Sequence, residues 1–449
     1  MRKTAKFTIV GLILGLSGIL SIPAAMATSL RDVYQDALKH DPSFAKAAAN
    51  WESAKLNLPL AMTGNGSPGS GLFPNISLNG GVNRNYYDHF HTDNTVYGIS
   101  VTQPIFNFAT WESIKSASFG VKAATAQYLA ATQDLIKRVT TAYLEVLRAK
   151  ENLTVVQAKK AQIQQQYKTT WDEYVAGVLA ITPVYDAKAQ YDEAVVEELK
   201  NQNQLENALA NLKAITGTSY NKLNGLADMI PLEMPKPNSL SEWSHIAEKQ
   251  NYQLQSDLNI MLADQQNIKM AAAGMAPNLN MVGGYQRTST KSSMPVQTGD
   301  PGPRETSVGL SMNFPIFRGG YDIVNTKKAR YEYLSSSDQL EIDHRSIENQ
   351  LQQTYNSIDS LIKQVRADHQ AILSASQQLS ATKSGYDVGT RTMTDVLSSM
   401  TNLATSKSQY ANDRVNYLEN VINLKALAGT LSPDDLQRLD RHLNKQITF

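Results

Sequence analysis

The side chains that could carry out chemistry are few, and none stands at a spacing typical of an active site. His89 and His91, flanked by Asp88 and Asp93, form the densest group of possible metal ligands. Their spacing matches no zinc signature and they fall at the end of an expected hairpin, so we expect a solvated loop there. The chain contains no cysteine, which excludes disulfides, thiolate metal sites and a cysteine nucleophile.

The sequence gives no support for an enzymatic function. It pairs no nucleophile with a base and contains no phosphate-binding loop and no cluster of metal ligands, so we expect no catalytic residue, no metal and no cofactor. The 42 basic and 41 acidic side chains nearly balance, which argues against a nucleic-acid partner. A periplasmic enzyme therefore has no motif to support it.

The chain is built from two similar halves. The tripeptide Pro-Ile-Phe at 104–106 recurs at 315–317, and Asn-Leu-Lys-Ala at 211–214 recurs at 423–426. A period of about 210 residues is far longer than a solenoid repeat, so we interpret it as a tandem duplication of a half-domain. We expect a first repeat over residues 28–225, a second over residues 226–431, and a polar tail over residues 432–449 that is helical rather than a strand.

Each repeat reads as a helix, two strands, a very long helix and a further helix. Apolar positions in the long helices follow alternating steps of three and four, as in the seam of a coiled coil. In the first repeat these positions are Thr132, Leu135, Val139, Ala142, Val146, Ala149, Leu153 and Val156. In the second repeat they are Ile347, Leu351, Thr354, Ile358, Leu361, Val365, Ile372, Ala375 and Leu379. Asp368 breaks the second seam. As one helix, residues 109–173 would extend roughly 100 Å.

Two pairs of segments, at 74–104 and 277–315, alternate apolar with small polar side chains. Each segment has roughly the ten residues that a tilted strand needs to cross a bilayer. Aromatic residues gather at both ends of these hairpins, as in the interfacial belts of membrane proteins. They are Tyr86, Tyr87, Phe90 and Tyr97 near one end and Phe106, Phe108, Trp111, Phe314 and Phe317 near the other. Because about eight strands are the fewest that close a useful barrel, the pattern implies an oligomer of two or three chains.

The N-terminal residues predict export from the cytoplasm. Arg2, Lys3 and Lys6 precede an apolar run at 7–20 and the small-residue motif Ala-Met-Ala at 25–27, so residues 1–27 predict a cleavable signal peptide. After residue 27 no stretch approaches the roughly 20 apolar residues of a membrane-spanning helix. If the chain enters a membrane, it does so as strands. The alternative is a non-channel coiled-coil structural protein of the cell envelope.

The most specific motifs lie where the long helices turn back. The sequences Ala-Gly-Val-Leu-Ala-Ile-Thr at 176–182 and Gly-Tyr-Asp-Val-Gly-Thr-Arg-Thr-Met-Thr-Asp-Val-Leu at 385–397 strongly resemble the TolC family of outer-membrane efflux and secretion ducts. The resemblance covers about residues 30–436. It implies an α+β membrane protein, a homotrimer in which each chain gives four strands to one twelve-stranded β-barrel that continues as a long α-helical coiled-coil tunnel.

The same resemblance implies a place and a set of partners. The duct would lie in the outer membrane of a Gram-negative bacterium, in contact with outer-membrane lipid, and its tunnel would extend into the periplasm. It would work with a periplasmic adaptor protein and with an inner-membrane pump or secretion ATPase. It would have no catalytic step.

The resemblance further implies a gate at the periplasmic entrance. In TolC-like ducts a Tyr and an Arg after the second turn bond to a Thr-Asp pair after the first. Here Tyr386, Arg391 and Thr182 match, whereas Pro183 stands in place of the Asp. Asp186 follows one helical turn later, so we expect it to pair with Arg391 in a weak substitute lock, with Tyr386 still bonded to Thr182.

A pore constriction and two contact points complete the implied site. Asp395 matches the first of two carboxylate positions in the family and Ser398 replaces the second, so we expect a single acidic ring that prefers cations. Gly177 and Gly389 match the tip turns at which the adaptor would contact the duct, and both suit a positive φ.

A structural role is the alternative for these polar residues. Thr182 followed by Pro183, and Thr394 followed by Asp395, each read as an N-cap followed by the first residue of a helix. A carboxylate at that place also meets the positive end of the helix dipole.

Overall fold

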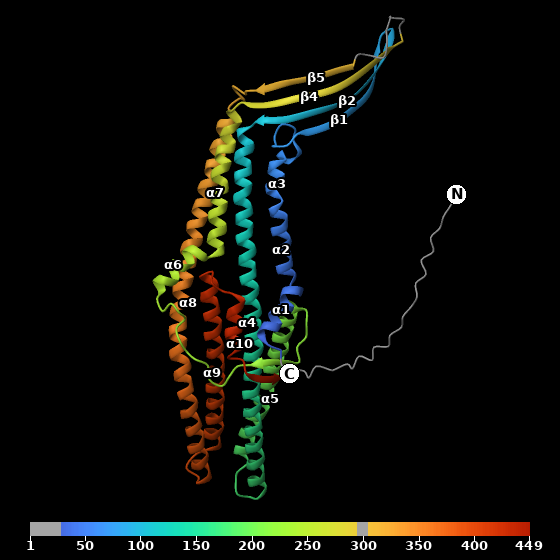
Figure 1. The fold of residues 1–449 in the computed structure, drawn as a ribbon. Helices are drawn as coiled ribbons and strands as arrows, with labels where there is room; N and C mark the ends of the chain where they lie inside the picture. The colour runs from blue at the N-terminus through green and yellow to red at the C-terminus, as the bar shows by residue number, and fades with distance from the viewer. Residues whose placement is uncertain (1–27, 294–303) are drawn as a thin grey trace, which may run out of the picture.

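The molecule is elongated, with a four-stranded sheet at one end and two long helical hairpins that extend away from it (Figure 1). The computed structural model describes residues 28–293 and 304–449. The predicted signal peptide, residues 1–27, lies outside the described residues. No helix in the described part of the chain is long and apolar enough to cross a membrane.

The sheet contains β1 (Asn75–Tyr87), β2 (Phe90–Phe106), β4 (Asn278–Ser292) and β5 (Arg304–Asn313), all antiparallel, in the order β1-β2-β4-β5. These strands confirm the two predicted hairpins, with β2 two residues longer and β5 two residues shorter than expected. The second repeat continues the sheet of the first, because β2 pairs with β4. Strands β1 and β5 are left as the two edges.

The strand register separates an apolar face of the sheet from a polar face. Ile76, Val101, Gly283 and Val308 are aligned across the four strands, so they point to the same side. The neighbouring row, on the opposite side, consists of Ser77, Ser100, Gly284 and Ser307. The apolar side chains are open to solvent in the single chain: Leu78 is 83% exposed and Val308 is 81% exposed. This sheet therefore lacks a core of its own to cover its apolar face.

Two pairs of helices make up the long hairpins. The first pair is α4 (Phe108–Val175) and α5 (Thr182–Thr216), and the second is α8 (Tyr321–Asp387) and α9 (Met393–Leu427). The long members have 68 and 67 residues and the short members 35 each, as a duplication requires. The predicted seams are confirmed, because most of their members are buried, including Leu135, Val139, Leu351 and Ile358.

Shorter helices cover the half of the long helices nearer the sheet (Figure 1). They are α1 (Leu30–His40), α2 (Pro42–Lys55) and α3 (Asn57–Met62) in the first repeat and α6 (Leu240–Gln250) and α7 (Tyr252–Ala272) in the second. The short 3₁₀ turns Gly64–Gly66 and Ala273–Met275 follow α3 and α7. The single helix predicted at the start of each repeat is therefore divided into segments.

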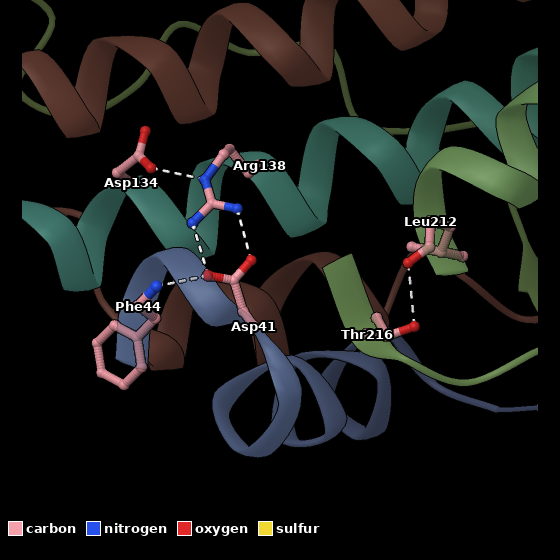
Figure 2. Close-up of polar contacts among 6 residues, drawn as sticks. All are labelled: Asp41, Phe44, Asp134, Arg138, Leu212 and Thr216. Carbon is pink, nitrogen blue, oxygen red and sulfur yellow. Dashed lines mark hydrogen bonds and ion pairs between the residues drawn. The ribbon is translucent and has the colours of Figure 1, made fainter. Parts of the chain in front are cut away.

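The first division has a clear cause in Asp41. Its carboxylate caps α2 by accepting from the amide of Phe44 at 2.6 Å, and it also accepts from Arg138 Nη1 of α4 at 2.8 Å (Figure 2). Arg138 in turn bonds to Asp134 one turn away. This geometry holds the pKa of Asp41 below its usual value, chiefly through the bond from Arg138. Asn251 caps α7 at the equivalent place in the second repeat.

The C-terminal residues differ from the prediction of a polar helical tail. Helix α10 (Pro433–Asp440) is followed by a strand, β6 (Lys445–Thr448), which pairs antiparallel with β3 (Lys222–Gly225). Leu436, Leu439 and Leu443 are buried in the main core. The three leucines are spaced three or four residues apart, so they lie on one face that packs against the core, although most residues of the segment are polar.

Candidate gate at the hairpin tips

The two long hairpins turn with the same backbone geometry, at the end of the molecule opposite the sheet (Figure 1). Gly177 has φ 74° and Gly389 has φ 76°. In the first turn the amides of Gly177 and Val178 bond to the carbonyls of Tyr174 and Glu173, at 2.9 and 3.0 Å. In the second turn the amides at 389 and 390 bond in the same way to the carbonyls at 386 and 385.

This pattern is a Schellman motif, which needs a left-handed residue that glycine supplies without strain. A Cβ at either glycine would meet no atom within 4 Å, so backbone conformation rather than crowding selects glycine. The predicted turn role of Gly177 and Gly389 is confirmed.

A small second core holds the two hairpins together near their tips. Its buried members come from all four long helices: Ile163, Ala187, Ala194, Ala375, Leu379, Met393, Val396, Leu397, Met400 and Leu403. Ala187 and Ala194 are the buried members from α5, where small side chains leave room for the neighbouring helices. The two tips of one chain are therefore packed against each other rather than splayed apart.

Tyr386 forms the shorter of two side-chain hydrogen bonds that join the hairpins at their tips, within the part of the chain that the structure describes. Its hydroxyl donates to Glu173 Oε2 at 3.2 Å, joining the last turn of α8 to the last turn of α4. Burial, reinforced by the Glu173 carboxylate, raises the pKa of Tyr386 to about 12, so the hydroxyl remains a neutral donor at neutral pH. The expected Tyr386–Thr182 bond is not formed within the chain, because the charged Glu173 is the stronger acceptor.

The predicted Arg391–Asp186 pair is also not formed within the chain. Asp186 Oδ2 instead accepts from Thr394 Oγ1 at 3.5 Å, between α5 and α9. Arg391 is exposed, and its side chain forms no ion pair among the described residues. A Cβ added at Gly385 would lie 2.8 Å from Cγ of Arg391. The Arg391 side chain therefore lies against its own hairpin instead of reaching α5.

Asp395 completes the cap of α9. Its carboxylate accepts from the amide and the hydroxyl of Thr392, both at 2.9 Å, and the hydroxyl of Thr392 accepts from the amide of Asp395. The amide and hydroxyl of Thr392 hold the pKa of Asp395 below its usual value, so the carboxylate is ionised at neutral pH. The predicted N-cap at Thr394 is wrong by two positions: Thr392 is the cap, and Asp395 is the third helical residue.

The first tip lacks such a cap. Ile181 occupies the N-cap position of α5 and makes no side-chain cap bond, so the predicted N-cap at Thr182 is wrong. Pro183 lies within the first turn, where its missing amide would have no partner in the helix in any case. Ser398 is exposed on α9, nearly one turn beyond Asp395. The two positions at which the family resemblance implies carboxylates therefore carry Pro183 and Ser398.

Glu173 is the residue that sequence reasoning missed. Gly177 and Gly389 differ by 212 positions, so the repeat aligns Tyr386 with Tyr174, and Glu173 lies just before that equivalent tyrosine. A search for acidic residues in the last turn before each tip glycine would have found it. Among the described residues there is also no group of three or more side chains placed to hold a metal ion.

Comparison with known proteins also divides the chain into two similar halves, each with one long helical hairpin. A family model described as outer membrane efflux protein matches the chain twice, over residues 33–218 and 243–430. The chain is 33% identical to Outer membrane protein TolC of Escherichia coli K12, over 97% of this chain and 88% of that protein. It is 23% identical to the alkaline protease secretion protein AprF of Pseudomonas aeruginosa, over 92% of this chain and 87% of that one.

The solved structure of CusC has the same fold, with a TM-score of 0.79 at 16% identity, covering 90% of this chain and 92% of that chain. The two matches of the family model coincide with the two helical hairpins and their strands. With one third of residues identical to TolC over nearly the full length, the chain belongs to the outer membrane efflux protein family, the TolC family.

Proposed function

We propose that three copies of this chain form a passive duct through which small molecules and proteins leave the cell. As a member of its family, the chain is a non-enzymatic efflux and secretion channel of the outer membrane with a periplasmic extension. The observation that carries the trimer is the sheet, whose edge strands β1 and β5 pair with no further strand among the described residues. Each unpaired backbone group in lipid costs several kcal/mol, so the edges must pair between chains.

Three chains give twelve strands, which leave room for a pore. The exposed apolar face of the sheet, which carries Leu78 and Val308, would face lipid, and the opposite face, which carries Ser77, Ser100 and Ser307, would line the pore. The 68- and 67-residue helices would continue this pore as a tunnel of roughly 100 Å. A coiled-coil structural protein would need neither the apolar sheet face nor its free edges.

The tips are where this duct would open and close. We place the gate at Thr182, Pro183, Asp186, Tyr386, Arg391, Asp395 and Ser398, with Glu173 as the added partner of Tyr386. Asp395 would supply a ring of three carboxylates. With Pro183 in place of a carboxylate and Arg391 in no ion pair among the described residues, the closed state would be held chiefly by the Tyr386–Glu173 bond, the longer Thr394–Asp186 bond and the apolar tip core.

The tips of the duct would also be the place where it meets its partners. The turns at Gly177 and Gly389 would contact a periplasmic adaptor, which connects the duct to an inner-membrane pump or secretion ATPase. Similarity to a protein named for alkaline protease secretion supports protein cargo, and the family description supports efflux.

Crosslinking the tips tests this function in living cells. Because the chain has no cysteine, Asp186→Cys together with Thr394→Cys places thiols only where α5 meets α9. The variant would replace the wild-type gene in its host, and drug susceptibility and secreted protein would be measured with and without a short thiol-to-thiol crosslinker. We expect normal export before crosslinking and loss of export afterwards, comparable to the gene deletion.

The two single-cysteine variants are the controls, since the reagent modifies them without joining the helices. The proposal fails if deletion of the gene changes neither drug susceptibility nor secreted protein. It also fails if the doubly substituted, fully crosslinked protein exports as well as the wild type.

A further inference from the structure

A cavity of about 360 Å³ lies in the middle of the molecule, where α4, α9 and β6 meet. Its apolar lining is Val155, Leu226, Ala411 and Ile447. Its basic lining is Lys150, Lys407, Arg414 and Lys445, and Glu151 is its acidic member. A concave site above about 300 Å³ with an apolar lining and a few polar groups has the size and character of a small-molecule site.

Arg414 is a buried cation whose hydrogen-bonding capacity is incompletely used. Its residue is 3% exposed. One Nη donates to the carbonyl of Ala227, and the other lies 3.8 Å from Glu151 Oε1, too far for a hydrogen bond. Its Nε is buried and has no partner in the described part of the chain. Buried polar groups are nearly always hydrogen-bonded, so Arg414 is a cation in the cavity lining that the described residues satisfy only in part.

The charges around the cavity favour an anion. Four basic side chains line it against one carboxylate. Burial raises the pKa of Glu151 despite the attraction of Arg414 and Lys445, which weakens Glu151 as a counter-charge. Asp228 bonds to Lys445 at 3.2 Å and is 89% exposed, outside the lining. The cavity therefore retains an excess of positive charge over the carboxylates that face it among the described residues.

We propose that this cavity binds an amphipathic anion, with a compact carboxylate-like head at Arg414 and an unbranched apolar chain against Leu226 and Ile447. A guanidinium attracts a carboxylate through its charge, and the Nη of Arg414 that is not bonded to Ala227 can donate to one. The basic rim around Lys407 would attract the head, whereas a purely polar anion would leave the apolar lining unused. A neutral amphiphile would leave Arg414 unpaired.

The position of the cavity gives the bound anion a structural consequence. Lys445 and Ile447 belong to β6, whereas Lys150 and Arg414 belong to α4 and α9. A ligand in contact with all three would tie the C-terminal strand to the two long helices midway between the sheet and the tips.

Binding of radiolabelled decanoate to the full-length protein in lipid nanodiscs tests the proposal. Equilibrium dialysis would compare decanoate with decanol, which has the chain without the charge, and with acetate, which has the head without the chain. We expect saturable decanoate binding, one site per chain, after subtraction of empty nanodiscs, and none for the other two probes. Ala411→Leu, which fills the cavity, should abolish the binding.

Lys407→Gln should weaken decanoate binding about fivefold, as expected for loss of one exposed ion pair. Because Lys407 is exposed, this variant should fold even if Ala411→Leu does not. The matched control is Lys168→Gln, an exposed lysine on α4 outside the cavity, which should bind like the wild type. The proposal is overturned if decanol competes as well as unlabelled decanoate, or if Lys407→Gln and Lys168→Gln bind decanoate equally.

Discussion

Near the tips, Tyr386 is a side chain through which a directed bond joins the two hairpins of one chain. Its hydroxyl reaches Glu173 from a half-buried position. The bond can be broken without disturbing the tip core, because the ring can remain in place while the hydroxyl is removed. It is therefore the most specific point at which to probe the closed state.

Tyr386→Phe should raise the resting conductance of the channel. The lost hydrogen bond is worth about 1 kcal/mol, which should shift the balance between closed and open tips about fivefold toward open. Planar-bilayer recordings of single channels measure this directly. Tyr174→Phe is the matched control: it is the equivalent tyrosine in the other repeat, and its hydroxyl has no hydrogen-bond partner among the described residues. If both variants change the resting conductance equally, the Tyr386 hydroxyl has no specific role in closing the gate.

Asp395 and Ser398 should set ion selectivity at the same end of the duct. Asp395→Ala should reduce the preference for cations, because a ring of carboxylates concentrates them at a constriction. Ser398→Asp should add a second ring nearly one turn away and strengthen block by multivalent cations. Reversal potentials and block by a trivalent cation measure both effects. If Asp395→Ala leaves selectivity unchanged, the residue acts only as the cap partner of Thr392.

At the scale of elements, α8 carries a carboxylate where its apolar seam is broken. Asp368 is half-buried and its Oδ2 has no hydrogen-bond partner among the described residues. It faces Asp413 of α9, which is 6% exposed and accepts from Gln409 and Asn416. Burial, reinforced by Asp413, raises the pKa of Asp368 to about 6. Helices α8 and α9 therefore pack best when this carboxyl is protonated.

This carboxyl makes stability depend on pH. Because the pKa is higher in the folded state than its usual value near 3.8, the contribution is fully present below pH 4 and is lost as the pH rises through about 6. Asp368→Asn should therefore stabilise the protein above pH 6, by about 1 kcal/mol once solvent screening is allowed for, and make no difference near pH 4. Thermal melting midpoints from pH 4 to 8 measure it.

Asp359→Asn is the matched control, since Asp359 lies on the same helix and pairs with Lys363 at the surface. It should not change the pH profile. A profile for Asp368→Asn parallel to that of the wild type would show that the carboxyl does not titrate in this range.

The long repeated helices could be predicted closely from the sequence, whereas the residues that cap them could not. Apolar periodicity over dozens of residues placed α4 within two residues of its observed ends, because many positions contribute to the same period. The N-cap of α9 was predicted two positions too late, at Thr394 instead of Thr392. Both are threonines that can cap a helix, and only the backbone conformation of the turn selects one of them. The partner of Tyr386 depended on tertiary contact between α4 and α8. The strand β6 was missed because four residues carry almost no pattern.

For the whole molecule, the decisive feature is that one chain leaves its sheet incomplete. Strands β1 and β5 have free edges, and the apolar row is exposed. An exposed, regular strand edge pairs readily with another chain. The fold of the single chain therefore favours association with further copies, which would pair the free strand edges.

Native mass spectrometry in detergent should give a trimer. Its stability derives from strand pairing and should survive mild detergents at low protein concentration. Val308→Pro places a residue that cannot donate to the ladder in edge strand β5 and should shift the population toward monomer. Ile323→Pro, at an exposed position in the first turn of α8, introduces the same residue away from the sheet and should remain trimeric. A wild-type protein that is mainly monomer or dimer would contradict twelve-strand closure.

Single-channel recording from the purified wild-type protein in planar bilayers tests the central claim most directly. If three chains form a passive duct, current should appear in discrete, uniform steps without ATP or any partner, with a preference for cations conferred by Asp395. Failure of folded, membrane-inserted trimers to conduct, at any voltage and with the Tyr386–Glu173 bond removed, would contradict the account.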